Sequence, residues 1–230
     1  MKCWGVVPAA GRGARMNGGV PKQYRMLGGV SVLDRSIAAL LAHPAMQAVM
    51  VALSARDDRW SESRCAGDAR VLSCTGGGSR AESVHNALEA LAGVAGGDDW
   101  VAVHDAVRPC LRGADLARLL SEAAGEPAGA VLVAPISDTV KQVAGGYIER
   151  TLDRGCVVRA VTPQVFRYRL LREALAGALA DGVAPTDEAA AMERAGHPVR
   201  AVAGDAGNVK ITWPGDLRRA ESNLETGDTQ

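Results

Sequence analysis

A glycine-rich loop with three cationic side chains follows the first apolar segment of the chain. Residues 6–24 read VVPAAGRGARMNGGVPKQY and contain Arg12, Arg15 and Lys22. Pro8 is expected to end the apolar strand, because proline has no N–H to donate to a β-ladder. Backbone N–H groups of such a loop can surround phosphate oxygens, and the cations supply the countercharge. The pattern therefore predicts a binding site for a nucleoside triphosphate.

Two common phosphate-binding motifs do not fit this loop. The pair Gly11 and Gly13 is followed by Met16, where a dinucleotide-binding fingerprint requires glycine or alanine. The GK[ST] ending of a P-loop is also absent from the sequence. A surface loop without a ligand is the alternative interpretation. The cations that directly follow an apolar strand favour a ligand.

A second glycine cluster leads into a predicted helix. Residues 74–83 read CTGGGSRAES, in which Ser79 and Glu82 have the spacing of a capping box. Helix N-terminal N–H groups attract an anion or a polar base edge. An ordinary helix start with a flexible lead-in is the alternative. Three glycines exceed what a cap needs, so the cluster favours contact with a ligand.

The third motif, VHDAVRP at residues 103–109, places a carboxylate directly after an apolar strand. Asp105 there can orient a substrate hydroxyl or bind Mg²⁺, which prefers oxygen ligands. Arg108 can hold a phosphate with two hydrogen bonds. A structural salt bridge between the two side chains is the alternative. His104 is interpreted as a core histidine outside the chemistry.

Several further polar residues occur at the ends of predicted strands. Each of them alone is usually a turn residue, a cap or a solvated charge. Lys210 differs because it lies in the apolar segment VKIT, and a lysine that points toward the ligand edge of a sheet suits phosphate binding. The others are Thr139, Lys141, Thr162, Gln164, Thr186, Asp187, Glu188 and Asn208.

Apolar strands alternate with helical patterns along the chain, which predicts an α/β domain with a mostly parallel sheet and helices on both faces. Ligands of such sheets bind beyond the carboxyl ends of the strands. The expected strands are residues 3–7, 48–53, 71–73, 100–104, 130–134, 199–202 and 209–212. The expected helices are residues 32–41, 80–91, 115–124, 168–179, 187–195 and 214–224.

Residues 138–152 break this alternation and read as a β-hairpin around Gly145 and Gly146. An isolated hairpin is marginally stable in water, so a second subunit is a candidate to cover it. We expect one domain over residues 1–230, with residues 138–152 as a protruding arm.

Composition excludes several classes of protein. The chain has 26 Lys+Arg and 26 Asp+Glu, and this balance argues against nucleic acid or an anionic membrane as the main partner. The five cysteines are scattered without zinc-site spacing, which indicates a reducing compartment. No apolar run reaches the roughly 18 residues of a membrane span, and the N-terminus lacks a signal-peptide pattern. We therefore expect a soluble cytoplasmic protein.

The motifs PAAGRGARM, PKQY, GGGSRAESV, VHDAVRP, DTVK, TLDR, TPQ, TDEA and NVKIT occur in this order over nearly the whole chain. In them the chain resembles bacterial 2-C-methyl-D-erythritol 4-phosphate cytidylyltransferases. The first two motifs are typical of sugar nucleotidyltransferases generally, and the combination of VHDA-x-RP, TPQ and TDEA is more specific. Ribitol-5-phosphate cytidylyltransferases share many of these motifs, so another polyol phosphate stays open as substrate. A non-catalytic nucleotide-binding module is the third alternative.

The resemblance implies a Rossmann-like nucleotidyltransferase fold and a homodimer with exchanged arms. It implies transfer of CMP from CTP to methylerythritol 4-phosphate with release of pyrophosphate, and Mg²⁺ bound mainly through the CTP phosphates, without assigned protein ligands. By the same resemblance, Arg15 and Lys22 stabilise the transition state. Lys210 positions the methylerythritol phosphate together with Arg154, which reaches in from the other subunit.

The resemblance also implies two further sets of contacts. Gly78 stands where family members often carry an acidic residue, so cytosine contacts there are expected from the backbone. The residues expected around the methylerythritol phosphate are Asp105, Arg108, Thr139, Thr162 and Thr186. The residues expected at the nucleotide are Pro8, Ala9, Ala10, Gly11, Gly13, Gly77, Arg80, Ser83 and Ala106.

Overall fold

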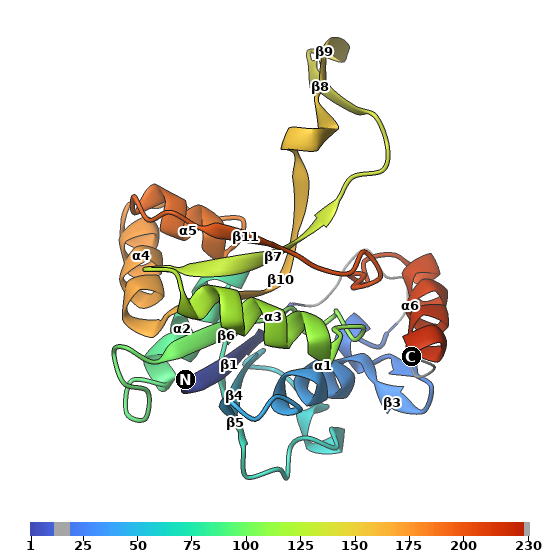
Figure 1. Cartoon of the computed structure of the whole chain (residues 1–230). Coiled ribbons are helices and arrows are strands. Elements are labelled where there is room, and N and C mark those ends of the chain that lie inside the picture. The colour runs from blue at the N-terminus through green and yellow to red at the C-terminus, as the bar shows by residue number, and fades with distance from the viewer. Residues whose placement is uncertain (12–18, 228–230) are drawn as a thin grey trace.

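The computed structural model describes every residue except 12–18 and 228–230. Its centre is a seven-stranded sheet in the order β11-β7-β10-β6-β1-β4-β5, with helices on both faces (Figure 1). Neighbouring strands are parallel except at β10, which runs antiparallel to both β6 and β7. The prediction of a mostly parallel sheet is therefore confirmed. The strands are β1 (Cys3–Pro8), β4 (Met46–Leu53), β5 (Val71–Thr75), β6 (Trp100–Val103), β7 (Gly129–Pro135), β10 (Val158–Arg167) and β11 (Arg200–Ala203).

Capping residues start two helices where the sequence predicts them. The Ser31 hydroxyl accepts the backbone N–H of Asp34 at 3.0 Å, and Ser79 with Glu82 forms a complete capping box. The helices are α1 (Val32–Leu41), α2 (Arg80–Ala90), α3 (Gly113–Ala124), α4 (Tyr168–Ala180), α5 (Glu188–Arg194) and α6 (Pro214–Gly227). Shorter elements are η1 (Lys22–Tyr24), η2 (Trp60–Glu62), η3 (Arg154–Cys156), β2 (Met26–Leu27) and β3 (Val30–Ser31).

The start of α5 differs from the prediction. The predicted helix of residues 187–195 includes Asp187, whereas Asp187 is the N-cap, and its carboxylate accepts the backbone N–H of Ala190 at 2.9 Å. The extended backbone of Asp187, with φ −153° and ψ −178°, places this carboxylate over the first turn. Asp187 therefore lies outside the helix, which begins at Glu188.

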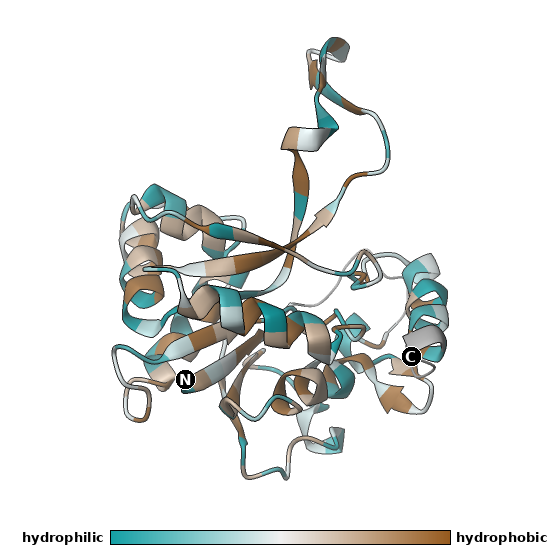
Figure 2. Cartoon of the chain, viewed as in Figure 1, coloured by the Kyte–Doolittle hydropathy of each residue, from teal (hydrophilic) through white to brown (hydrophobic). Residues whose placement is uncertain are grey.

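Both faces of the central strands are buried, as β1 illustrates. Val7 packs in the cluster that contains Leu33 and Ile37 of α1, whereas Val6 packs in the cluster that contains Val84 of α2. These five side chains are fully buried. Figure 2 shows hydrophobic residues concentrated on these strands and hydrophilic residues on the outer sides of the helices. Helices α1 and α3 cover one face of the sheet, and α2, α4 and α5 cover the other.

Two segments differ from the predicted strands. Residues 209–212 form no strand, and the Ile211 N–H donates to the Val107 carbonyl at 2.9 Å in a loop and not to a neighbouring strand. Strand β10 was not predicted, since Pro163 interrupts its pattern. The register of β10 against β7 shifts between Ala160 and Gln164, and proline is tolerated at such an irregularity.

The predicted hairpin is confirmed. Strands β8 (Val140–Ala144) and β9 (Tyr147–Leu152) pair antiparallel and project away from the sheet (Figure 1). Gly145 and Gly146 have φ of +57° and +84°, the conformation that a tight hairpin turn requires. Tyr147 is 81% exposed and Ile148 is 64% exposed. The arm therefore presents apolar side chains that its own chain does not cover.

Two expectations from composition can be compared with the described residues. No helix in this part of the chain is long and apolar enough to cross a membrane. All five cysteines are free thiols, in agreement with their scattered positions.

Replacing Gly129 with alanine is expected to lower the free energy of unfolding by at least about 2 kcal/mol. Gly129 has φ +149°, and an added Cβ would lie 2.1 Å from the Val165 carbonyl oxygen. Gly177→Ala is the control, since a Cβ there meets open space in α4 and should stabilise the helix by roughly 0.5–1 kcal/mol. Urea unfolding measures both variants. Equal stability of the two would contradict the prediction.

Candidate active site

A cavity of about 240 Å³ lies at the carboxyl ends of β1 and β6, where a parallel sheet is expected to bind its ligand. Segments that are far apart in the sequence form its wall: the loop after β1, the start of η1, the loop before α2, the loop after β6, and Lys210. Its lining residues are Pro8, Ala9, Ala10, Gly11, Lys22, Gln23, Gly77, Gly78, Ser79, Arg80, Ser83, Asp105, Ala106, Val107 and Lys210. Eleven of these are residues that the sequence assigned to the site.

The loop before α2 is held close to its own helix. The Gly77 N–H donates to the Ser83 hydroxyl at 3.0 Å, and the Gly78 N–H donates to a carboxylate oxygen of Glu82 at 2.6 Å. A Cβ on Gly77 would lie 2.3 Å from the Glu82 Cβ, so glycine is required at that position. The glycine cluster and the family resemblance predicted that these two N–H groups bind the ligand. In the structure both of them already donate to side chains of α2.

Gln23 lies on the other side of the cavity, and no pattern in the sequence singled it out as a site residue. Its buried side chain donates to the carbonyls of Ala9 at 3.0 Å and Gly11 at 3.2 Å. Next to it, the Lys22 ammonium donates to the Ile211 carbonyl at 3.2 Å. Element η1 therefore joins the loop after β1 to the segment that carries Lys210.

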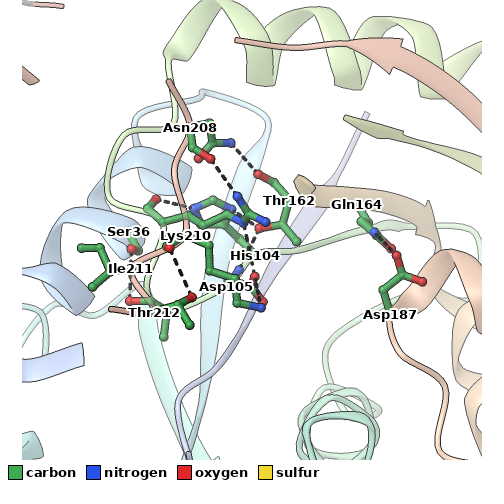
Figure 3. A network of polar contacts seen from close by, with 12 residues as sticks. Ser36, His104, Asp105, Thr162, Gln164, Asp187, Asn208, Lys210, Ile211 and Thr212 are labelled. Atoms are coloured by element: carbon green, nitrogen blue, oxygen red, sulfur yellow. Dashed lines mark hydrogen bonds and ion pairs between the residues drawn. The ribbon is translucent and has the colours of Figure 1, made fainter. Parts of the chain in front are cut away.

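Asp105 is the centre of a charged cluster on the cavity wall, part of which is drawn in Figure 3. Its Oδ1 accepts from Arg80 Nε at 3.0 Å. Its Oδ2 accepts from Lys210 Nζ at 3.0 Å and from Arg108 Nε at 3.3 Å. The alternative of an Asp105–Arg108 salt bridge is therefore correct, and the same carboxylate also holds the two cations that line the cavity.

The charges of the cluster shift the pKa of Asp105. Burial alone would raise the pKa of this carboxyl group, but the neighbouring Arg80, Lys210 and Arg108 hold it well below its usual range. Asp105 is therefore ionised at neutral pH and acts as a fixed negative charge that orients cations. It is not a proton acceptor for catalysis.

A buried hydrogen-bonded frame lies behind Asp105, and its members Thr162, His104 and Asn208 are labelled in Figure 3. The Thr162 hydroxyl accepts the Asp105 backbone N–H at 3.0 Å and lies 3.0 Å from His104 Nδ1. His104 Nε2 lies 3.0 Å from the Arg108 carbonyl oxygen. The Asn208 amide donates to the Thr162 carbonyl at 2.8 Å. His104 is therefore a core histidine, as predicted, and it supports the loop that carries Asp105.

Comparison with known proteins identifies the family of this chain. The family model described as 2-C-methyl-D-erythritol 4-phosphate cytidylyltransferase matches residues 3–226. The chain belongs to this cytidylyltransferase family. The 2-C-methyl-D-erythritol 4-phosphate cytidylyltransferase of Pseudomonas entomophila is 48% identical over 216 residues, which are 93% of this chain and 92% of that protein.

Solved structures of family members have the same fold. One described as 4-diphosphocytidyl-2C-methyl-D-erythritol synthase is 34% identical, with a TM-score of 0.83 over 97% of this chain and 99% of that chain. The 2-C-methyl-D-erythritol 4-phosphate cytidylyltransferase of Francisella tularensis is 32% identical, with a TM-score of 0.82 over 97% of this chain and 100% of that chain. The Rossmann-like nucleotidyltransferase fold is therefore established for this chain.

Some residues that the cytidylyltransferase resemblance assigned to the site do not line the cavity. Arg154 belongs to η3 at the base of the arm, and its guanidinium donates to the Ser137 carbonyl at 2.5 Å. Thr139 and Thr186 are exposed, the first just before β8 and the second just before Asp187. Within one chain, none of the three belongs to the described cavity wall.

Four other assigned residues need separate mention. Arg108 and Thr162 are buried behind Asp105 and act on the cavity through it. The assignments of Arg15 and Gly13 lie outside the described residues.

The stability of this cytidylyltransferase is expected to fall by about 2 kcal/mol between pH 7 and pH 5 because of His104 alone. Burial lowers the pKa of His104 to about 4, whereas an unfolded histidine titrates near 6.5. In that interval the unfolded state binds the proton and the folded state does not, so acid favours unfolding. Urea unfolding at several pH values measures the slope. His104→Gln should flatten it, and an unchanged slope in that variant would contradict the assignment.

Proposed function

We propose that this cytidylyltransferase transfers CMP from CTP to 2-C-methyl-D-erythritol 4-phosphate at the cavity around Asp105. The observation that carries the proposal is the set of cations on one wall at the carboxyl ends of the strands. Lys22, Arg80 and Lys210 all line the cavity, and Asp105 orients two of them. Cations on such a wall reduce the repulsion between two anionic substrates that bind side by side, one a nucleoside triphosphate and the other a phosphate monoester.

The chemistry needs charge neutralisation more than proton transfer. The second pKa of a phosphate monoester lies near 6, so the attacking oxygen is already anionic at neutral pH. Negative charge then builds on the α-phosphate and on the leaving pyrophosphate. Lys22 and Arg15 stabilise that charge, and Lys210 holds the attacking phosphate. The wall fits this division of work, because Asp105 is ionised and His104 lies behind it without facing the cavity.

Magnesium enters this reaction with the nucleotide. No group of three or more metal-ligating side chains occurs in the described part of the chain. The Asp105 oxygens already accept from three cations, so this carboxylate is a poor metal ligand. These residues fit Mg²⁺ that is held by the CTP phosphates, where it neutralises charge on the triphosphate.

A homodimer completes the site. In the proposed dimer, arms are exchanged, and Arg154 and Thr139 of each chain act near the partner's methylerythritol phosphate. The exposed apolar side chains of β9 support a second copy as the cover of the arm, since an uncovered hairpin is marginally stable. Location in the cytoplasm, without nucleic acid or membrane as a partner, remains a prediction.

A pyrophosphate-release assay tests the function directly. The purified chain is given CTP and Mg²⁺ with either methylerythritol 4-phosphate or ribitol 5-phosphate. Turnover with the first alcohol phosphate and little with the second is expected. Preference for ribitol 5-phosphate would move the chain to the related polyol class. CTP binding without turnover on either substrate would indicate the non-catalytic module.

A further inference from the structure

Glu188 is a buried carboxylate that the reaction described above does not use. It lies at the first position of α5 with 1% of its surface exposed. Its two oxygens accept from Arg80 Nη1 at 2.6 Å and Nη2 at 3.1 Å. The two residues are 108 positions apart in the sequence. Burial of such a pair costs desolvation energy that its attraction only partly offsets, so a gain in stability does not by itself explain the pair.

The pairing decides what Arg80 can do in the cavity. Its Nε–H donates to Asp105, and one N–H on each Nη donates to Glu188. The end of the guanidinium, which would hold a phosphate with two hydrogen bonds, is therefore filled by Glu188. Two N–H groups are left for a ligand. The structure thus gives Arg80 a mainly orienting role, between a carboxylate on the cavity wall and a carboxylate behind it.

Glu188 itself is held rigidly from β10. The Gln164 amide donates to the Asp187 carboxylate at 2.9 Å, a contact drawn in Figure 3. The Gln164 side-chain oxygen Oε1 accepts the Ala189 backbone N–H at 2.8 Å. These contacts fix the residues on both sides of Glu188. Asp187 already caps the helix, so the Glu188 side chain is free to point at Arg80.

A line of contacts runs from α5 to the cavity. Glu188 holds Arg80, Arg80 holds Asp105 Oδ1, and Asp105 Oδ2 holds the Lys210 ammonium. The Lys210 side chain is 42% exposed, whereas Asp105 is 7% exposed, so Lys210 is the member of the line that reaches into the cavity. Loss of the Glu188 charge would free the end of Arg80 to turn toward Asp105 and compete with Lys210 for it.

We propose that Glu188 is a positioning residue for cytidylyl transfer: through Arg80 it keeps Asp105 Oδ2 available to orient Lys210. The proposal rests on the proposed function of the cavity. It adds a residue that contacts no substrate and that acts only through the line of ion pairs.

The primary test is steady-state kinetics of Glu188→Gln, which keeps the shape and removes the charge. We expect kcat/KM for methylerythritol 4-phosphate to fall by roughly 10-fold to 100-fold, as for a misplaced reacting group. The KM for CTP should change by less than about threefold, because the glycine loops and Lys22 are untouched. A variant with both parameters at the wild-type values would overturn the proposal.

The control is Glu89→Gln, because Glu89 makes the same kind of two-oxygen pair with Arg172 between α2 and α4. That pair is on the surface, with 43% of Glu89 exposed, and outside the cavity wall. It should leave kcat/KM unchanged. An equal loss in both variants would mean a general packing effect and would overturn the proposal. An inactive wild type would instead refute the proposed function, so the two failures are distinguishable.

A double-mutant comparison separates positioning from folding. Arg80→Met and Arg80→Met/Glu188→Met are measured for thermal unfolding and for turnover. If Glu188 acts through Arg80, the double variant should be no less active than Arg80→Met alone, while the apolar pair should recover thermal stability. A further tenfold loss of activity in the double variant would show that Glu188 acts by another route, which would also overturn the proposal. This comparison stands even if Glu188→Gln does not fold.

Discussion

Replacing Lys22 with alanine is expected to lower kcat by roughly 10²-fold to 10³-fold, the usual loss for one preorganised charge at a reacting centre. Lys22 lines the cavity and donates to the Ile211 carbonyl at 3.2 Å. That hydrogen bond holds the ammonium beside the segment that carries Lys210. This hydrogen bond is partly exposed, so its loss should cost no more than about 1 kcal/mol of unfolding free energy.

The measurement is single-turnover chemistry with saturating CTP, together with urea unfolding. Lys2→Ala is the control, because Lys2 is an exposed lysine outside the cavity wall, and its turnover should stay at the wild-type level. Arg15→Ala is expected to match Lys22→Ala on the basis of the family motif. Near wild-type turnover of Lys22→Ala would remove its catalytic role.

Sequence patterns were sufficient to predict the site residues that lie at the ends of strands. Asp105 follows four buried residues of β6, and an apolar run that ends in a carboxylate identifies a ligand edge in an α/β sheet. The glycine loops and Lys210 are recognisable for the same reason. The fold class follows from the alternation of strands and helices, which local hydrophobic periodicity encodes directly.

Contacts between distant segments could not be predicted in this way. Glu188 follows a helix cap and looks like an ordinary acidic first-turn residue, and nothing local indicates Arg80 as its partner. Residues 209–212 are apolar enough for a strand, but in the described part of the chain Ile211 bonds to Val107 in a loop and not to a neighbouring strand. For Arg154 the family motif predicts a role in the reaction, but within one chain its guanidinium bonds to the Ser137 carbonyl and does not reach the cavity.

Because Arg154 lies outside the cavity of its own chain, we expect that mixed dimers of two inactive variants recover activity. Lys22→Ala damages the cavity of its own chain. Arg154→Ala, if the arms are exchanged, damages the cavity of the partner chain. In a heterodimer of the two variants, one cavity has both defects and the other has neither. A purified heterodimer should therefore have about half of the wild-type activity per dimer, as a two-fold symmetric assembly with independent sites requires.

Coexpression of the two variants with different tags, followed by sequential purification on both tags, gives the heterodimer free of the parent dimers. The pyrophosphate-release assay compares it with each parent under the same conditions. A heterodimer of Lys22→Ala with wild type is the control, and it should also retain about half of the activity, since its second cavity is intact. If Arg154 acted within its own chain, each cavity of the mixed dimer would carry one defect, and the activity would stay at the level of the parents. Either that result or purification of the chain only as a monomer would exclude a site that is shared between two chains.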